Sequence, residues 1–201
     1  MIEIDQLNFI GRGLHRSVYE HPEDKTRCIK IQHMAGGEKE SIREKRYCEF
    51  LDRRNISWAM LPKFHGTVDT SKGQGVVFDL IRDYDGQVSK MLLTYLDSED
   101  LTREYFGQLR VALAKLRDYL HDYGIVTMTI QPKNILYKRT DSDQGVLYIV
   151  DNIGTSDFLP ISTYVKYFAR KKLKRKWARF EQKMLSDHSH NPLVAELLSD
   201  Y

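Results

Sequence analysis

The fold is decided by residues 120–136, which read Leu-His-Asp-Tyr-Gly-Ile-Val-Thr-Met-Thr-Ile-Gln-Pro-Lys-Asn-Ile-Leu. Gly124 is a natural C-terminal stop for a helix that precedes it. The loop that follows, at 127–134, carries Thr129. A threonine hydroxyl cannot act as a general base near neutral pH, so this position supplies no base. The residues from Asn134 onward predict a strand.

The residues before the loop predict one long helix over 101–123. Its apolar side chains recur every three or four positions, as a single buried stripe requires. They are Leu101, Tyr105, Leu109, Leu113, Leu116 and Leu120. This helix delivers the chain to the loop.

After the loop, 134–137 and 146–150 predict a hairpin that is joined by the polar turn 141–145. Asp151 follows the second strand. Its carboxylate and the amide of Asn134 suit a divalent cation that holds triphosphate oxygens. Asp–Asn pairs near turns also occur without any metal.

The N-terminal region predicts short strands that are separated by turns. Gly11 and Gly13 precede Val18, and a turn at 21–24 leads into the strand that contains Lys30. Glycines let a hairpin backbone approach phosphates closely, and a lysine on the next strand neutralises their charge. Two glycines alone are weak evidence, but their spacing from the valine and the lysine predicts a phosphate-binding hairpin.

A helix is predicted over 38–54 and is opened by Gly36-Gly37. Its inward face follows helical spacing and consists of Glu40, Glu44, Cys48 and Leu51. Glu44 therefore lies where its carboxylate can pair with Lys30 and orient it. Glu40 competes for this role, and a solvated glutamate on a charged helix is the remaining alternative.

The rest of this region predicts an antiparallel sheet. A turn and a returning strand are expected over 55–67, a hairpin turn at 73–75 and a central strand at 76–81. Residues 1–82 then form a first lobe, and 83–201 form a second lobe that is mainly helical.

These residues together resemble the protein-kinase-like superfamily. Within it, the sequence resembles the bacterial YrbL family, named for its link to the PhoP regulatory network. The motifs that carry this resemblance are G-x-G-x-H-R-x-x-Y-x-H-P-E-D from Gly11, R-C-I-K-I from Arg27, F-H-G-T-V from Phe64, I-V-T-M from Ile125, P-x-N-I-L from Pro132 and the tetrad Asp151-Asn152-Ile153-Gly154. They span most of the chain and imply an α+β, bilobal protein-kinase-like fold with an antiparallel-sheet N-lobe and a truncated helical C-lobe.

The resemblance also implies a site for ATP or a related nucleotide with Mg²⁺. Its cofactor-binding residues would be Gly11 and Gly13 over the phosphates, Val18 and Cys28 beside the base, Lys30 and Glu44 at the phosphates, Phe78 behind the base, and Asp79 to Ile81 through backbone hydrogen bonds. Asn134 and Asp151 would bind the metal. The site is expected in a cleft shared by the two lobes.

The chain departs from the kinase pattern mainly at the positions that carry the catalytic residues of kinases. The His, Arg, Asp and Lys of the kinase signature are replaced by Thr127, Met128, Thr129 and Gln131. Arg16 replaces the third glycine, where it either stiffens the hairpin or adds a cation over the phosphates. Ile153 stands at the position of the metal-loop glycine. Only residues 152–201 follow the metal aspartate, too few for the usual activation segment and substrate platform.

The leading hypothesis is therefore a nucleotide- and Mg²⁺-binding pseudokinase with a regulatory role and weak or absent phosphotransfer. Phosphotransfer catalysis is mostly positioning and charge stabilisation, so loss of the base need not abolish it. The alternative is a small-molecule or unconventional phosphotransferase, or a nucleotidyl transferase. A further alternative is a non-nucleotide binding module that works through its basic C-terminal helix.

The composition, with 41% hydrophobic and 29% charged residues, is ordinary for a globular protein. No apolar run approaches the roughly 20 residues that a membrane span requires, and the N-terminus lacks a signal-peptide pattern. Cys28 and Cys48 are too far apart in sequence for a metal-type pair, which favours a reducing, cytoplasmic location.

Positive charge is concentrated in residues 166–179, which carry eight Lys and Arg residues and no acid. A helix is predicted from Pro160 to Lys183, with a stripe formed by Tyr164, Phe168, Leu173, Trp177 and Phe180. Lys166–Arg179 is either the solvated face of a core helix or a surface that docks nucleic acid, anionic membrane or an acidic protein. No groove-reading motif is present, so sequence-specific DNA recognition is not expected. A short helix is predicted over 192–201.

Overall fold

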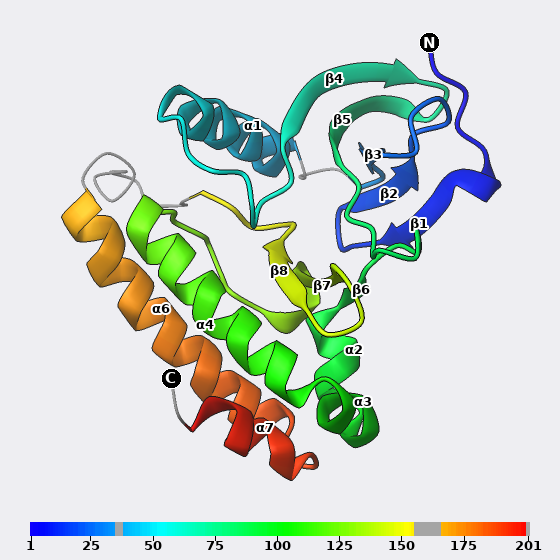
Figure 1. Cartoon of the computed structure of the whole chain (residues 1–201). Coiled ribbons are helices and arrows are strands. Elements are labelled where there is room, and N and C mark those ends of the chain that lie inside the picture. Colours follow the sequence, from blue (N-terminus) through cyan, green and yellow to red (C-terminus); the bar gives the residue numbers. More distant parts are fainter. Residues whose placement is uncertain (35–37, 155–165, 200–201) are drawn as a thin grey trace. The chain divides into compact units, whose positions relative to one another are not determined.

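The computed structural model describes residues 1–34, 38–154 and 166–199, and it divides into two compact units (Figure 1). The first unit comprises Met1–Trp58 and Pro62–Ile81, and the second comprises Ala59–Leu61 and Arg82–Tyr201. The first unit is a sheet with one long helix, and the second is mainly helical (Figure 1).

The first unit is built on a five-stranded antiparallel sheet in the order β1-β2-β3-β5-β4. Its elements are the short helix η1 (Gln6–Asn8), β1 (Phe9–Arg12), β2 (Arg16–Glu20), β3 (Arg27–Gln32), α1 (Glu38–Arg53), β4 (Phe64–Thr70) and β5 (Gly73–Asp79). Three of the four strand pairings join consecutive strands, so the turns in the sequence largely determine the order of the sheet.

An apolar core lies on one face of this sheet. Side chains alternate between the two faces along a strand, and this face packs Ile4, Ile29, Ile31 and Val77 together. Gly75 is required at this face, because a Cβ there would lie 2.3 Å from Cγ2 of Ile29. By the same alternation, Lys30 projects from the opposite face.

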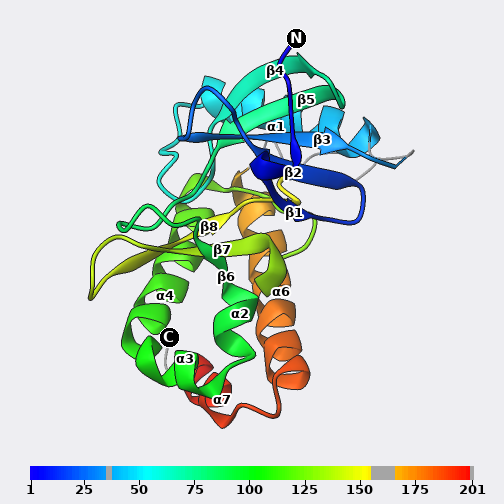
Figure 2. The same cartoon turned by 90° about the vertical axis from the view of Figure 1, so that its right-hand side faces the viewer.

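The second unit combines helices with a three-stranded antiparallel sheet in the order β6-β7-β8. Its elements are β6 (Lys90–Met91), α2 (Leu92–Leu96), α3 (Glu99–Glu104), α4 (Phe106–Tyr123), η2 (Pro132–Asn134), β7 (Ile135–Arg139), β8 (Gly145–Ile149), α6 (Lys166–Asp187) and α7 (Pro192–Leu198). Helices α4 and α6 contact each other and lie side by side in Figure 1, whereas in the turned view of Figure 2 α2 overlaps the space between them. Gly124 ends α4 in the left-handed conformation, with φ 60° and ψ 42°, as the sequence predicts.

The single helix predicted over 101–123 is wrong, because α3 and α4 are separate helices. Thr102 Oγ1 donates a hydrogen bond of 2.6 Å to the carbonyl of Tyr95. Tyr105, at the break, packs edge-on against Tyr95 and Tyr137, with ring centroids 5.4 Å and 6.1 Å away. These tertiary contacts outweigh the helical periodicity of the segment.

Helix α6 carries the basic segment and has an apolar inward side. That side consists of Ala169, Leu173, Trp177, Phe180 and Met184, all buried at helical spacing. Phe168 was expected in this stripe but is 48% exposed, because Ala169 occupies the inward position. Pro160 and Tyr164 of the predicted helix, and Gly36-Gly37 before α1, lie outside the described residues.

Among the described residues, no helix is both long enough and apolar enough to cross a membrane. Helix α6 has the necessary length, with 22 residues, but its charged side chains exclude it.

Candidate functional site

Five of the predicted site residues share one face of the first unit's sheet. Gly11 of β1 is opposite Val18 of β2, and Val18 is opposite Lys30 of β3. Residues that stand opposite each other in an antiparallel pair lie on the same face. Cys28 is two residues before Lys30, and Phe78 is opposite Cys28, so both belong to this face as well.

Lys30 and Glu44 form a buried ion pair. Lys30 Nζ lies 3.3 Å from Glu44 Oε1, and the two side chains are 8% and 6% exposed. Glu44 is one helical turn before the buried Cys48, so α1 directs it inward. The Lys30 ammonium also lies 4.4 Å from the centroid of the Phe78 ring, a cation–π contact. The side chain of Glu40, the competing partner, is outside the described residues.

Arg16 is buried in the same cluster. Its Nη1 donates to Oε2 of Glu44, so one carboxylate accepts from both Arg16 and Lys30. The carbonyl of Arg16 accepts from the amide of Gly13 at 2.8 Å. Arg16 therefore ties the glycine hairpin to α1. Of the two roles expected for it, these contacts favour stiffening the hairpin.

Neither Gly11 nor Gly13 is required by packing within the described protein. A Cβ at Gly11 would meet no heavy atom within 4 Å, and one at Gly13 would meet only the carbonyl of Arg16, at 3.5 Å. Neither residue has a positive φ. The space beside this backbone is open, as close approach of a ligand to the main chain requires.

The end of β5 is fixed by contacts within the first unit. Asp79 Oδ1 lies 2.6 Å from Nε2 of His65, and Asp79 Oδ2 accepts from the amide of Lys63 at 2.8 Å. The Asp79 carbonyl accepts a weak bond of 3.7 Å from Sγ of Cys28. Burial raises the pKa of the Cys28 thiol to about 11, so the thiol is uncharged at neutral pH. Ile81, which is buried, is the last residue of the unit.

In the second unit, Asn134 and Asp151 come together at one end of the β7–β8 hairpin. The amide of Val150 donates to the Asn134 carbonyl at 2.9 Å, just beyond the strand ladder. Asp151 directly follows Val150, and its Oδ1 accepts from the amide of Asn152 at 2.8 Å. Both side chains are partly exposed and carry oxygen atoms, the ligands that Mg²⁺ prefers.

The loop after α4 is held by the residues that follow Asp151. The amide of Met128 donates to the Asn152 carbonyl at 2.7 Å, and the amide of Gly154 donates to the Val126 carbonyl at 2.8 Å. Asn152 and Gly154 have φ values of 61° and 100°, which Asn and Gly tolerate best. The glycine therefore still supplies a turn, although it stands one position later than in the kinase pattern.

Thr129, at the position of the missing base, is exposed. Its hydroxyl accepts a hydrogen bond of 3.2 Å from Nδ2 of Asn152. Thr127 is completely buried, and its Oγ1 has no hydrogen-bond partner among the described residues. The hydrogen bond from Asn152 orients Thr129. The only proton acceptor that the Thr129 side chain offers is still a hydroxyl, which is too weak to act as a general base.

Lys176 of α6 contacts this loop and was not singled out from the sequence. Its Nζ donates to the carbonyl of Thr127 at 2.6 Å and also to the carbonyl of Met128. Position 176 lies seven residues after the buried Ala169, and therefore on the inward side of the helix. That spacing is the signal available in the sequence. The C-terminal helix thus holds the loop directly.

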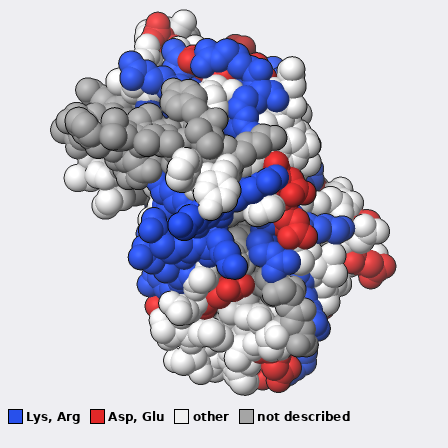
Figure 3. Space-filling view, turned by 90° about the vertical axis from the view of Figure 1, so that its left-hand side faces the viewer, with Lys and Arg blue, Asp and Glu red and all other residues white. Residues whose placement is uncertain are grey.

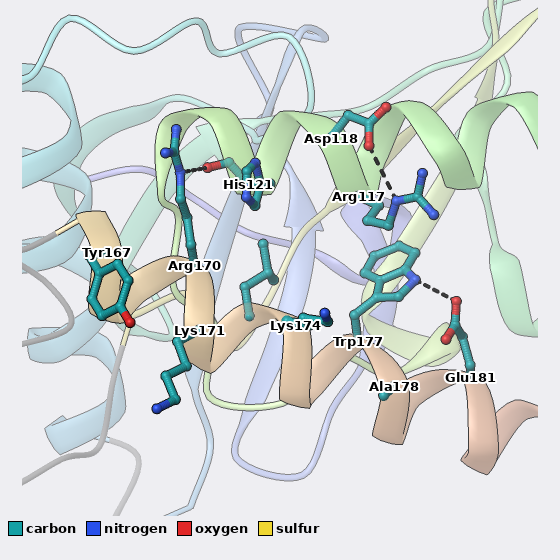
Figure 4. A pocket seen from close by; sticks show the side chains of 11 residues that line it. Arg117, Asp118, His121, Tyr167, Arg170, Lys171, Lys174, Trp177, Ala178 and Glu181 are labelled. Carbon is teal, nitrogen blue, oxygen red and sulfur yellow. Dashed lines mark hydrogen bonds and ion pairs between the residues drawn. The ribbon is translucent and has the colours of Figure 1, made fainter. Parts of the chain in front are cut away.

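Three other cations of α6, Arg170, Lys171 and Lys174, line a groove between α6 and α4. Figure 3 shows lysine and arginine side chains gathered on this face of the molecule. The groove has a volume of about 780 Å³ and is lined by Arg117, Asp118, His121, Tyr167, Arg170, Lys171, Leu173, Lys174, Trp177, Ala178 and Glu181 (Figure 4). Arg170 Nε donates to the carbonyl of His121 at 3.2 Å, and Trp177 Nε1 donates to Glu181 at 2.8 Å. The helix therefore packs on α4 and also exposes charge.

A family model described as PhoP regulatory network protein YrbL matches residues 2–185. The chain is 41% identical over 182 residues to the uncharacterized protein YrbL of Escherichia coli strain K12. This match covers 90% of this chain and 86% of that protein. It is also 26% identical over 170 residues to the ovarian-specific serine/threonine-protein kinase Lok of Drosophila melanogaster. That match covers 78% of this chain and 34% of the kinase.

Among solved structures, the chain resembles one from the CAK complex of Chaetomium thermophilum bound to ATP-γ-S, with a TM-score of 0.53 and 15% identity. The likeness covers 72% of this chain and 45% of the solved chain, so the matched part spans less than half the length of the solved chain. At this level of identity the likeness shows the fold alone. The kinase-like α+β fold implied by the sequence resemblance is confirmed.

Proposed function

This chain belongs to the YrbL family of PhoP regulatory network proteins, and from this premise we propose that it is a cytoplasmic pseudokinase with a regulatory role. It binds ATP or a related nucleotide with Mg²⁺, and its phosphotransfer is weak or absent.

The observation that carries the proposal is the buried pair of Lys30 and Glu44. In protein kinases, a strand lysine that is oriented by a helical glutamate holds the nucleotide phosphates. Lys30 stands in one row with Val18 and Gly11, and the space beside Gly11 is open. If the Lys30–Glu44 pair served only the stability of the core, open space beside Gly11, on the same face of the sheet, would not be needed.

Magnesium would be held by Asn134 and Asp151. Mg²⁺ keeps several waters and binds through one or two carboxylates together with substrate phosphates. One carboxylate and one amide oxygen from the protein are therefore sufficient, provided that the nucleotide supplies the remaining oxygens.

Thr129 is the reason to expect weak or absent phosphotransfer. A hydroxyl that accepts from Asn152 cannot remove a proton from a substrate near neutral pH. The alternative of a small-molecule or unconventional phosphotransferase, or a nucleotidyl transferase, would need a different base or reaction through positioning alone.

Thermal unfolding of the full chain with and without ATP and Mg²⁺ tests the binding proposal. We expect ATP–Mg²⁺ to raise Tm in the wild type, because a ligand that binds only the folded state stabilises it. Lys30→Met and Asp151→Ala should abolish the rise. Lys25→Met and Asp143→Ala are matched controls at exposed positions of the same units and should keep it. No rise in the wild type would refute nucleotide binding.

Incubation with γ-labelled and α-labelled ATP separates the pseudokinase from an enzyme. We expect no label transfer above the level of the Asp151→Ala variant. Transfer of γ-label that is lost in Asp151→Ala would establish a phosphotransferase. The same behaviour with α-label would establish a nucleotidyl transferase.

The groove between α4 and α6 favours a second function, the docking of an acidic protein segment. Lys171 and Lys174 are exposed at the groove, and Trp177 forms part of its wall. Asp118 and Glu181 also line it, and they would repel the continuous charge of a nucleic acid more than the spaced charges of a peptide. This surface is the basis of the binding-module alternative.

Binding of an acidic peptide, measured by tryptophan fluorescence at increasing salt, tests this second function. We expect the affinity to fall with ionic strength, because exposed charge contacts are screened. The double variant Lys171→Glu/Lys174→Glu should abolish binding, whereas Lys115→Glu, at an exposed position of α4, should not. Tighter binding to single-stranded DNA or to anionic vesicles than to the peptide would contradict the choice of a protein partner.

A further inference from the structure

A further cluster of side chains lies between the turn that joins α6 to α7 and the C-terminal end of α2. Figure 2 labels these three helices. His188 and His190 belong to that turn, and Asp97 is the residue at the C-terminus of α2. The potential ligand atoms of these three side chains all lie within 4.8 Å of one another. Two imidazoles and one carboxylate form a typical set of ligands for a transition metal.

Neighbouring hydrogen bonds hold the two halves of this cluster together. Asn191 is 2% exposed, and its Nδ2 donates to the carbonyl of Leu96 at 2.9 Å and to Thr102 Oγ1 at 2.8 Å. Leu96 directly precedes Asp97, and Asn191 directly follows His190. The backbone of the turn is therefore anchored beside Asp97 by uncharged groups.

His188 is the side chain that points to a ligand. It is 4% exposed, and its Nδ1 lies 3.0 Å from Oδ1 of Asp97, yet this nitrogen makes no aligned hydrogen bond among the described residues. A buried polar atom without a hydrogen bond costs free energy. Two atoms bound to one zinc ion, each about 2.0–2.2 Å from it, lie about 3–3.5 Å apart, so the observed separation suits shared coordination.

We propose that Asp97, His188 and His190 bind one divalent transition-metal ion of the zinc class. Imidazole ligands favour Zn²⁺, Ni²⁺ or Cu²⁺ over Mg²⁺ and Ca²⁺, which prefer oxygen ligands throughout. His190 completes the set, since its ligand atom already lies within 4.8 Å of the other two, and a water molecule fills the remaining position. The ion ties the end of α2 to the turn between α6 and α7, independently of any nucleotide.

A simple ion pair between His188 and Asp97 is the competing explanation. Such a pair needs neither a metal nor His190. His190 is exposed, so its replacement does not endanger folding, and it is the residue that discriminates between the two explanations.

The test is a titration of the full chain, freed of metal by a chelator, with Zn²⁺ and in parallel with Co²⁺. We expect one ion per chain, a rise in Tm with Zn²⁺, and a visible Co²⁺ absorption band without thiolate charge transfer. Loss of an outer partner alone typically costs about 10–100-fold in metal affinity, so His190→Gln should cost at least about tenfold. Asp97→Asn should behave similarly.

His121→Gln is the matched control. His121 Nδ1 lies 3.4 Å from Oδ1 of Asp122, but no third ligand joins this pair among the described residues. The control should bind Zn²⁺ like the wild type. Absence of saturable Zn²⁺ binding in the wild type, unchanged affinity in His190→Gln, or loss of binding in His121→Gln would each overturn the proposal.

Discussion

Arg16 donates a hydrogen bond to Oε2 of Glu44, whereas Lys30 donates to the other carboxylate oxygen, Oε1. The residue that replaces a glycine of the kinase pattern thus enters the cluster that positions the strand lysine. Because one carboxylate joins β2, β3 and α1, the stability of the first unit and the placement of Lys30 depend on the same side chain.

Replacement of Glu44 by Gln should destabilise the protein strongly. Removing one partner from a buried ion pair typically costs about 3–5 kcal/mol, and here two buried cations lose the same acceptor charge. We expect the free energy of unfolding in urea to fall by about this amount. Glu49→Gln, at an exposed position of α1, should stay within about 0.5 kcal/mol of the wild type. A loss as small as that of the control would show that Glu44 is not needed as a charge.

Gly11→Ala should separate nucleotide binding from stability. A Cβ at Gly11 meets no protein atom within 4 Å, so Tm should not fall, and the loss of backbone freedom in the unfolded chain should raise it slightly. ATP–Mg²⁺ binding, followed by calorimetry, should weaken because the Cβ occupies the space beside the phosphates.

Gly75→Ala is the contrasting variant. Its Cβ would collide with Ile29, so it should lower Tm sharply. If Gly11→Ala binds nucleotide as tightly as the wild type, the glycine hairpin does not cover the phosphates.

Lys176→Met should loosen the loop after α4. A hydrogen bond to a charged group contributes about 1.5–3 kcal/mol, and Lys176 donates to two carbonyls. We expect the free energy of unfolding to fall by about that amount. Hydrogen exchange at the amides of Met128 and Gly154 should accelerate. Lys174→Met, at an exposed position of the same helix, should change neither quantity.

Stability should fall at alkaline pH because of the two buried thiols. Burial raises the pKa of Cys28 from 9.0 to about 11, and that of Cys48 from 9.0 to about 12. The unfolded chain therefore releases these protons first as the pH rises. The stabilisation is complete below about pH 9 and is lost as the pH rises through about 11 and 12.

The measurement is urea unfolding at about pH 8 and about pH 10, where each thiol can lower the free energy of unfolding by up to about 1.4 kcal/mol per pH unit. Cys48→Ala should reduce the slope. The pKa of Tyr95 is raised to about 12, so this phenol adds to the slope only above about pH 10. An unchanged free energy over this interval would contradict the burial of both thiols.

The contact between Lys30 and Glu44 could be predicted because two local periodicities determine it. Strand alternation decides the face of Lys30, and helical spacing groups Glu44 with the buried Cys48 and Leu51. The kinase-like fold was predicted from the resemblance of the sequence motifs to the YrbL family, whereas periodicity and turn residues predicted only the individual hairpins and helices.

The missed features depend on partners that are distant in sequence. Lys176 bonds to Thr127, 49 residues away, and Asn191 bonds to Thr102, 89 residues away. The periodicity of a single segment carries no information about such partners, which is why the break before α4 was not predicted. A local signal was available for the start of α3 and not for the break, because the hydroxyl of Ser98 accepts from the amide of Leu101 at 3.3 Å.

The hydrogen bonds that hold the loop after α4 join Met128 to Asn152 and Gly154 to Val126 through main-chain atoms. At Met128 and Val126 any non-proline residue can make such bonds, whereas the positive φ values of Asn152 and Gly154 favour Asn and Gly. These bonds do not involve the side chain of residue 129. An acid at this position can therefore be replaced without a change in the backbone of the loop. For the same reason, the carboxylate of a Thr129→Asp variant would lie within hydrogen-bonding reach of the Asn152 side-chain amide, without any other change in the loop.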